Sequence, residues 1–359
     1  MVVARIVLFV LGAGLVWATA ASAVRTFVLP RGAPDFISGV VFIGVRRLFD
    51  LRLRGERLYK RRDRIMAFYA PVALLSLLPA WLILILLGYT AMYWGVGAAS
   101  WRTAFDFSGS SLLTLGLTSL DSTLQAALGF SEAALGLILV ALLIAYLPTI
   151  YSAFSRREVA VAMLEVRAGT PPSCVEMIER YHRIHGLDRL NEVWRNWEIW
   201  FSDIEESHTS LAALALFRSP QPDRSWVTAS GAVLDTASLV NAALDIPHDP
   251  QADLCIRSGF LALRRIADFF GIAYDMNPRP SDPISIQRAE FEAVVDELAS
   301  KGIPLKADRD QAWRDFQGWR VNYDTVLLTL ADLTMAPYAP WSSDRRIKYR
   351  PRPLIHRVR

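Results

Sequence analysis

The stretch AFYAPVALLSLLPAWLILILLGYTAMYWGVGAASW, residues 67–101, contains no charged side chain. A helix needs about 20 consecutive apolar residues to cross the hydrocarbon core of a bilayer, and this stretch is longer than that. Residues 6–24 and 133–155 are also long, apolar and free of charge. The sequence therefore predicts three membrane-spanning helices and an all-α membrane protein.

The composition agrees with a membrane protein that also has a sizeable soluble part. Of the 359 residues, 53% are hydrophobic and 21% are charged, and the mean hydropathy is +0.26. Two cysteines are too few for a disulfide scaffold or for a cysteine-based metal site. The length allows two separate units.

The distribution of basic residues predicts the orientation of the spans. Eleven Lys or Arg side chains lie between Arg25 and Arg64, and the pair Arg156-Arg157 follows the third span. Short loops with such an excess remain in the cytoplasm. We therefore expect a multi-pass protein of the cell membrane, with the N-terminus and residues 100–131 outside and residues 156–359 in the cytoplasm.

An alternative concerns the first span. Arg5, the apolar core and Ala21-Ser22-Ala23 together resemble a signal peptide with a small-residue cleavage site. Cleavage would leave the eleven basic residues on the outer face, against the positive-inside rule. Retention as a span is the favoured interpretation.

Residues 36–64 mix apolar and basic side chains at helical spacing. This pattern predicts an amphipathic helix on the inner leaflet, where each basic residue gains about 1 kcal/mol from anionic lipid. A solvated connector is the alternative. The predicted lipid-binding residues are Arg46, Arg47, Arg52, Arg54, Lys60, Arg61 and Arg62.

The run SSLLTLGLT, residues 110–118, lies between the second and third spans. Irregular backbone at bilayer depth is tolerated only where it lines water or is buried in protein. The order of span, short helix, Thr-X-Gly run and span resembles the two-transmembrane potassium channels of bacteria and their non-selective relatives. The resemblance covers residues 67–155, less than a third of the chain.

The resemblance implies a pore helix over residues 103–113 and a filter in a homotetramer. Thr114 and Gly116 would take the threonine and first glycine of the family's Thr-Val-Gly-Tyr-Gly filter, whose carbonyls replace an ion's hydration shell. The complete predicted filter is Thr114, Leu115, Gly116, Leu117 and Thr118, with Ser119 and Asp121 at the outer mouth. Leu117 and Thr118 depart from the family's tyrosine and second glycine, so the permeant cation, potassium or sodium, stays open. No other cofactor is expected.

Two residues of the third span are candidate gating hinges. Gly136 can permit bending, and Pro148 frees a backbone carbonyl and can kink the helix. Ordinary helix packing explains both residues equally well.

The remaining residues show helical spacing between Pro and Gly breaks, as in residues 307–333. We find no Gly-x-Gly-x-x-Gly run after a strand and no Walker lysine. His182 and His185 are three apart on a predicted helix, but two surface histidines explain that spacing better than a metal site. We assign no catalytic residue and no metal ligand, and we expect neither an enzyme nor nucleic-acid binding.

The predicted domains are a span at 1–30, the basic amphipathic segment at 31–66, the pore module at 67–155, a helical cytoplasmic domain at 156–343 and a basic tail at 344–359. The favoured function is a tetrameric cation channel whose cytoplasmic domain regulates gating. The alternative is a membrane-anchored scaffold or sensor that works through the cytoplasmic domain and has a non-conducting pore.

Overall fold

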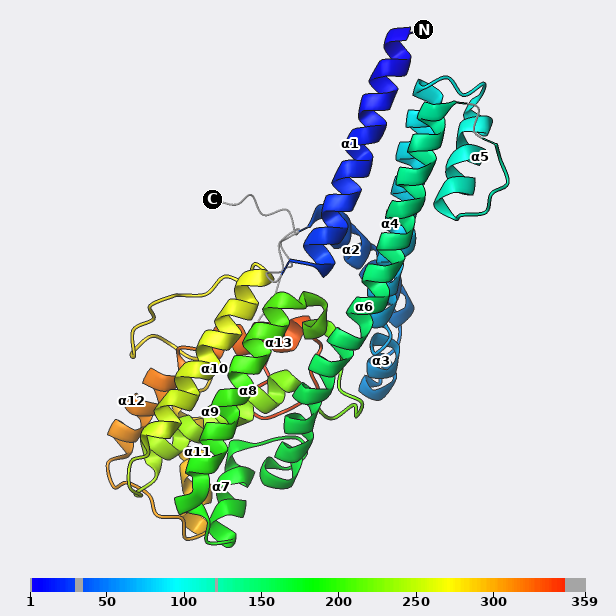
Figure 1. Cartoon of the computed structure of the whole chain (residues 1–359). Helices are drawn as coiled ribbons and strands as arrows, with labels where there is room; N and C mark the ends of the chain where they lie inside the picture. Colours follow the sequence, from blue (N-terminus) through cyan, green and yellow to red (C-terminus); the bar gives the residue numbers. More distant parts are fainter. Residues whose placement is uncertain (1, 30–34, 120–121, 346–359) are drawn as a thin grey trace. The chain divides into compact units, whose positions relative to one another are not determined.

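The computed structural model describes residues 2–29, 35–119 and 122–345, and these residues form an all-helical protein (Figure 1). The chain divides into two compact units. The N-terminal unit comprises residues 1–54 and 68–151, and the C-terminal unit comprises residues 55–67 and 152–359. The predicted all-α class is confirmed, and the predicted segment 31–66 is shared between the two units.

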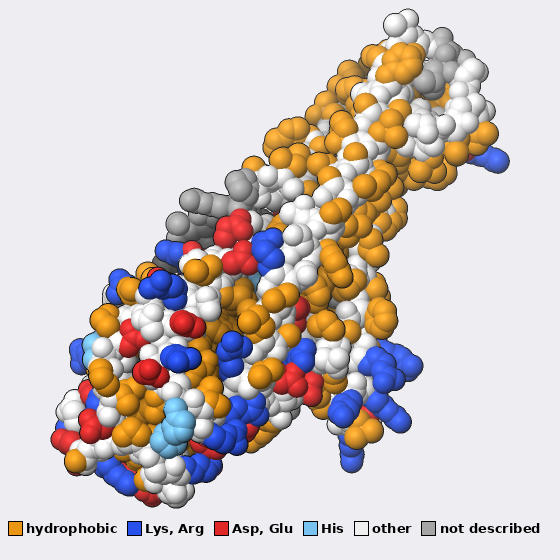
Figure 2. Space-filling view, turned by 60° about the horizontal axis from the view of Figure 1, so that its bottom comes forward, with side chains coloured by type: hydrophobic (Ala, Val, Ile, Leu, Met, Phe, Trp, Pro, Cys, Tyr) orange, Lys and Arg blue, Asp and Glu red, His pale blue; other side chains and the backbone are white. Residues whose placement is uncertain are grey.

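The N-terminal unit contains the apolar helices. These are α1 (Val2–Phe27), α2 (Phe36–Leu53), α4 (Tyr69–Gly95), α5 (Trp101–Leu112) and the first part of α6 (Thr123–Ala168). Three helical segments are long and apolar enough to cross a membrane: α1, residues 59–95 and α6. Figure 2 shows hydrophobic side chains over most of the visible face of this unit, as expected for a surface that meets lipid.

Glycines allow α1 and α4 to approach each other closely. A Cβ atom added at Gly88 of α4 would lie 2.7 Å from Val16 Cγ2 and 3.0 Å from the Gly12 carbonyl oxygen. Helix association in lipid depends on small residues of this kind, because the hydrophobic effect does not drive one apolar helix onto another. Ser22 adds a buried polar contact, since its hydroxyl accepts a hydrogen bond from Trp81 Nε1 at 3.0 Å. The small residues that resemble a cleavage site therefore have a packing role.

Replacing Gly88 with leucine should separate α1 from α4. The added side chain would overlap Val16 and the Gly12 backbone, and such overpacking costs at least about 1 kcal/mol. Gly14→Leu is the matched control, because a Cβ atom at Gly14 meets nothing within 4 Å. Thermal unfolding in detergent should show a lower midpoint for Gly88→Leu only; equal midpoints would contradict the proposed close packing.

The predicted amphipathic helix over residues 36–64 is wrong as one continuous element. The structure contains α2, a break at residues 54–58 and then α3 (Tyr59–Met66). Arg218 holds α3 within the C-terminal unit: its Nε donates to Asp63 Oδ1 at 2.5 Å and its Nη2 to the Tyr59 hydroxyl at 2.6 Å. The sequence pattern could not reveal this partner, because Arg218 lies far along the chain.

The C-terminal unit is built around a central helix, α9 (Trp226–Ala243). The helices α7 (Cys174–Arg183), α10 (Pro250–Phe269), α12 (Arg309–Arg320) and α13 (Asp324–Leu333) all contact α9. The remaining helical elements are η1 (Leu187–Arg189), α8 (Leu190–Ser210), η2 (Ala212–Leu216) and α11 (Arg288–Ser300). Nearly every residue of α9 is buried, and its buried polar side chains, such as Asp235 and Thr236, form hydrogen bonds within the unit.

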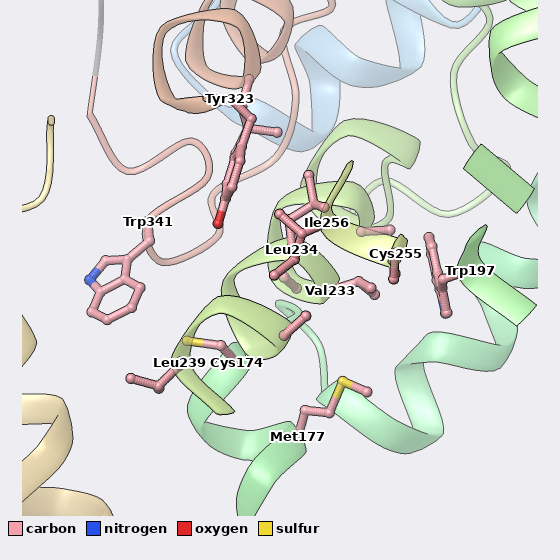
Figure 3. Packing of buried hydrophobic residues seen from close by; sticks show 14 of the residues in the cluster. Cys174, Met177, Trp197, Val233, Leu234, Leu239, Cys255, Ile256, Tyr323 and Trp341 are labelled. Carbon is pink, nitrogen blue, oxygen red and sulfur yellow. The ribbon is translucent and has the colours of Figure 1, made fainter. Parts of the chain in front are cut away.

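Figure 3 shows side chains from three of these helices in one core, with Cys174 and Met177 from α7, Leu234 and Leu239 from α9, and Cys255 from α10. Both cysteines are unpaired and buried. Burial raises the pKa of both thiols, which keeps them protonated and unreactive.

Candidate functional site

In the chain, the short helix α5 comes between the long helices α4 and α6, and it packs against α4. It begins at Ser100, whose hydroxyl accepts a hydrogen bond from the Thr103 N–H at 3.1 Å. It ends at Leu112, which is within one residue of the predicted pore-helix end. A helix over most of the predicted range 103–113 is therefore present, and it starts two residues earlier than predicted.

A Schellman motif closes the C-terminal end of α5. The N–H of Leu115 donates to the Ser110 carbonyl at 2.8 Å, and the N–H of Thr114 donates to the Ser111 carbonyl at 3.1 Å. The motif requires a left-handed residue after the cap, and Thr114 takes this conformation with φ +54°. Thr114 is β-branched, so this backbone is strained.

The predicted filter residues form the loop after this cap. Gly116 has φ +65°, which glycine adopts without strain, and the Ser110 hydroxyl accepts a hydrogen bond from the Leu117 N–H at 2.9 Å. The side chains of Leu115 and Leu117 are 54% and 77% exposed. Thr118 is half-buried and has no positive φ, so the strained threonine of this loop is Thr114.

Of the two predicted outer-mouth residues, Ser119 is exposed and Asp121 lies outside the described residues. The structure describes these positions in one chain. The arrangement of carbonyl oxygens around a four-fold axis therefore stays a prediction.

A buried carboxyl group joins α5 to α6. Glu132 of α6 is fully buried, and its Oε1 accepts a hydrogen bond from the Ser108 hydroxyl at 2.5 Å. The Tyr93 hydroxyl of α4 also interacts with this carboxyl and lies 3.3 Å from Ser111 Oγ. Hydroxyl groups from two neighbouring helices thus surround one acidic side chain, and an ionisable group inside an apolar helix bundle marks a functional region.

We expect Glu132→Ala to loosen α5, because it leaves the buried Ser108 hydroxyl without this partner. Because the Ser108 hydroxyl can still donate to the Leu86 carbonyl at 3.1 Å, the expected loss of stability is about 1 kcal/mol. Glu132→Gln should cost less, since an amide oxygen also accepts a hydrogen bond. Thermal unfolding in detergent measures the loss of stability in both variants. Asp50→Ala is the control, because Asp50 is an exposed carboxylate. A midpoint for Glu132→Ala equal to the control's would exclude a bracing role.

The two hinge candidates lie inside a continuous helix. A Cβ atom at Gly136 would be 2.8 Å from the Leu112 carbonyl oxygen, so this glycine permits close packing of α6 against the end of α5. Pro148 is also within α6, which continues without interruption to Ala168. The gating role of both residues stays a prediction.

The predicted lipid-binding residues occupy α2, the break and α3. Arg47, Arg52, Arg54, Lys60 and Arg61 are exposed. Arg46 and Arg62 are half-buried. Arg46 pairs with Asp50 at 3.2 Å and its guanidinium lies over the Tyr69 ring, so part of its charge is used within the N-terminal unit. Arg61 pairs with Glu56 at 3.6 Å. The exposed side chains of Arg47, Arg52, Arg54 and Lys60 stay available for the predicted contact with anionic lipid.

Sequence reasoning treated Glu132 only as a charge in the outer loop. Its position directly before the charge-free stretch 133–155 was the available signal.

Comparisons with protein-family models, with curated proteins and with solved structures found no match.

Proposed function

We propose that the N-terminal unit forms the pore of a cation channel, in which four copies of the chain surround one axis. The helix α5 is the pore helix, and residues 113–119 form the narrowest part of the pathway. The observation that carries this proposal is the exposed, hydrogen-bonded loop at the C-terminal end of a short helix between two apolar helices.

The physical argument begins with the bilayer. Backbone outside helices cannot face lipid, because its N–H and C=O groups would lose their hydrogen bonds to water. Leu115 and Leu117 are exposed in the single chain. Further copies of the chain would cover these side chains and leave the loop carbonyls facing a water-filled axis.

The chemistry of the loop favours cations. The C-terminal end of a helix carries about half a negative charge, and the end of α5 adjoins Thr114 and Gly116. Hydroxyl groups of Thr114, Thr118 and Ser119 supply further oxygen atoms near the loop carbonyls. Backbone and hydroxyl oxygens are the groups that replace the hydration shell of a monovalent cation.

Flux through the purified full-length protein in liposomes tests the proposal. We expect uptake of potassium or sodium, and we expect Gly116→Val to lower it by about tenfold or more, because φ +65° is strained for valine and the carbonyls would turn to relieve the strain. Gly14→Val is the control, since Gly14 is helical and meets nothing within 4 Å.

The oligomeric mass in mild detergent is the second measurement. A tetramer is required, so a monomer or a dimer would overturn the proposal, as would unchanged flux in Gly116→Val. A monomer without flux would favour a membrane-anchored sensor that works through the C-terminal unit.

A further inference from the structure

The C-terminal unit contains a cavity of about 720 Å³, a size typical of small-molecule sites. It lies where the C-terminal ends of α7 and α9, η1, the start of α8 and the segment before α10 meet. Its apolar lining includes Leu187, Leu190, Trp194, Val240, Leu244 and Ile246.

The indole of Trp194 gives this lining an unused hydrogen-bond donor. Trp194 is fully buried, and its Nε1 has no hydrogen-bond partner among the described residues. A buried N–H without an acceptor is costly, and native proteins rarely leave one without a reason. Because Nε1 is closed to solvent, an acceptor atom of a ligand would reach it only after the indole shifts toward the cavity.

The polar lining is rich in basic groups. Lys306 and three histidines contribute, namely His182, His185 and His248. Lys306 Nζ donates to the Asn241 carbonyl at 2.6 Å and forms no salt bridge with a described carboxylate. Its charge is therefore not neutralised within the described part of the chain. Figure 2 shows histidine side chains at the surface of this unit.

Two carboxylates also line the cavity, and one of them is already engaged. Asp249 accepts hydrogen bonds from Asn191 Nδ2 at 2.9 Å and from the Gln251 N–H at 3.0 Å, as the N-cap of α10. The positive N-terminal end of the α10 dipole partly offsets the negative charge of the Asp249 carboxylate. Asp188 is exposed in η1. Lys306 is thus the charged group that an anion can meet, and the histidine N–H groups can donate hydrogen bonds to it.

The backbone at His185 is a separate observation. His185 follows the C-cap of α7 and has φ +53°, a position that glycine or asparagine usually occupies. Residues held in this strained region cluster at functional sites. The imidazole of His185 lines the cavity. The left-handed backbone at this position costs histidine conformational energy that glycine would avoid.

We propose that this cavity binds a small organic anion. The apolar body of the ligand packs against Trp194 and the surrounding aliphatic side chains. Lys306 and the histidines hold a carboxylate or phosphate group. Among the described residues no group of three or more His, Cys, Asp or Glu side chains could hold a metal ion, so the anion meets protein groups directly.

Three probes of one shape and different charge test the proposal on the full-length protein in detergent. These are 2-naphthoate, 2-naphthylmethanol and 2-naphthylmethylamine, measured by isothermal titration. We expect 2-naphthoate to bind about tenfold tighter than the alcohol, and the amine to bind weakest. Equal affinities, or no binding of 2-naphthoate at millimolar concentration, would overturn the proposal.

Substitutions of residues that line the cavity test whether the anion binds there. His185→Gly should keep or raise the thermal midpoint, because glycine suits the backbone, and should weaken 2-naphthoate binding severalfold. Lys306→Gln should weaken the binding of the anion but not of the alcohol. Lys301→Gln is the control, because Lys301 pairs with Glu179 and Glu297 and does not line the cavity. If Lys306→Gln matched the control, this cavity would not be the anion site.

Discussion

Replacing Asp235 with alanine should destabilise the C-terminal unit by about 3 kcal/mol, the lower end of the range for breaking a buried ion pair. Asp235 Oδ1 lies 2.5 Å from Arg320 Nη1 and accepts a hydrogen bond from the Tyr323 hydroxyl at 2.9 Å. All three side chains are fully buried. Without Asp235, the Arg320 guanidinium keeps its desolvation cost and loses a direct counter-ion.

The expected loss of stability is at the lower end of the range for a broken buried ion pair because Arg320 has further partners. Its Nε donates to Asp324 Oδ1 at 2.7 Å and its Nη2 to the Trp341 carbonyl at 2.7 Å. This network joins α9, α12, α13 and the segment that follows α13. Burial disfavours the charged form, but the Asp235 and Asp324 carboxylates outweigh it and hold the pKa of Arg320 above its ordinary value. The guanidinium therefore cannot escape the cost by losing its proton.

Hydrogen exchange of α9 peptides in the full-length protein measures this destabilisation. Asp235→Asn should lose less, since the amide oxygen still accepts from Tyr323. Arg309→Ala is the control, because Arg309 forms an exposed pair with Asp296, and such pairs contribute little. Protection of α9 in Asp235→Ala equal to that in the control would show that the network adds no stability.

The sequence predicted the elements whose cause is local. The three apolar helices follow from runs of apolar residues, and α5 follows from its place between two of them. It missed two breaks. The predicted helix over 307–333 is two helices, α12 and α13, which the Arg320–Asp324 bond connects. The break before α3 contains Gly55 with φ +88°, a local cause, whereas the partner that holds α3, Arg218, comes from far along the chain.

The two candidate sites differ in how far the sequence alone could reveal them. The loop at Thr114 and Gly116 could be found from sequence because its residue types and spacing are contiguous. The cavity could not, because Trp194, His248 and Lys306 are far apart along the chain and meet only in the fold. His182 and His185 were visible as a pair, but the groups that complete their surroundings were not.

Acidification from pH 7 to pH 5 should destabilise the C-terminal unit by about 2 kcal/mol through His208 alone. Burial, and then the neighbouring Arg157 guanidinium, lower the pKa of His208 well below its ordinary value of 6.5. His208 Nε2 lies 3.2 Å from Arg157 Nη1, and its ring packs against Trp226. The folded protein therefore keeps the imidazole neutral, with Nε2 free to accept from Arg157.

The sign follows from proton binding in the two states. Below pH 6.5 the unfolded chain protonates this imidazole and the folded chain does not, so the stability present above pH 6.5 is lost as the pH falls. Urea unfolding of the full-length protein at pH 7 and pH 5 measures the loss. Carboxylates titrate in the same range in every variant, so the relevant quantity is the difference from His208→Gln, whose amide oxygen can still accept from Arg157. An identical pH dependence in wild type and His208→Gln would mean that His208 becomes charged in the folded state, which would require Arg157 to move away from it.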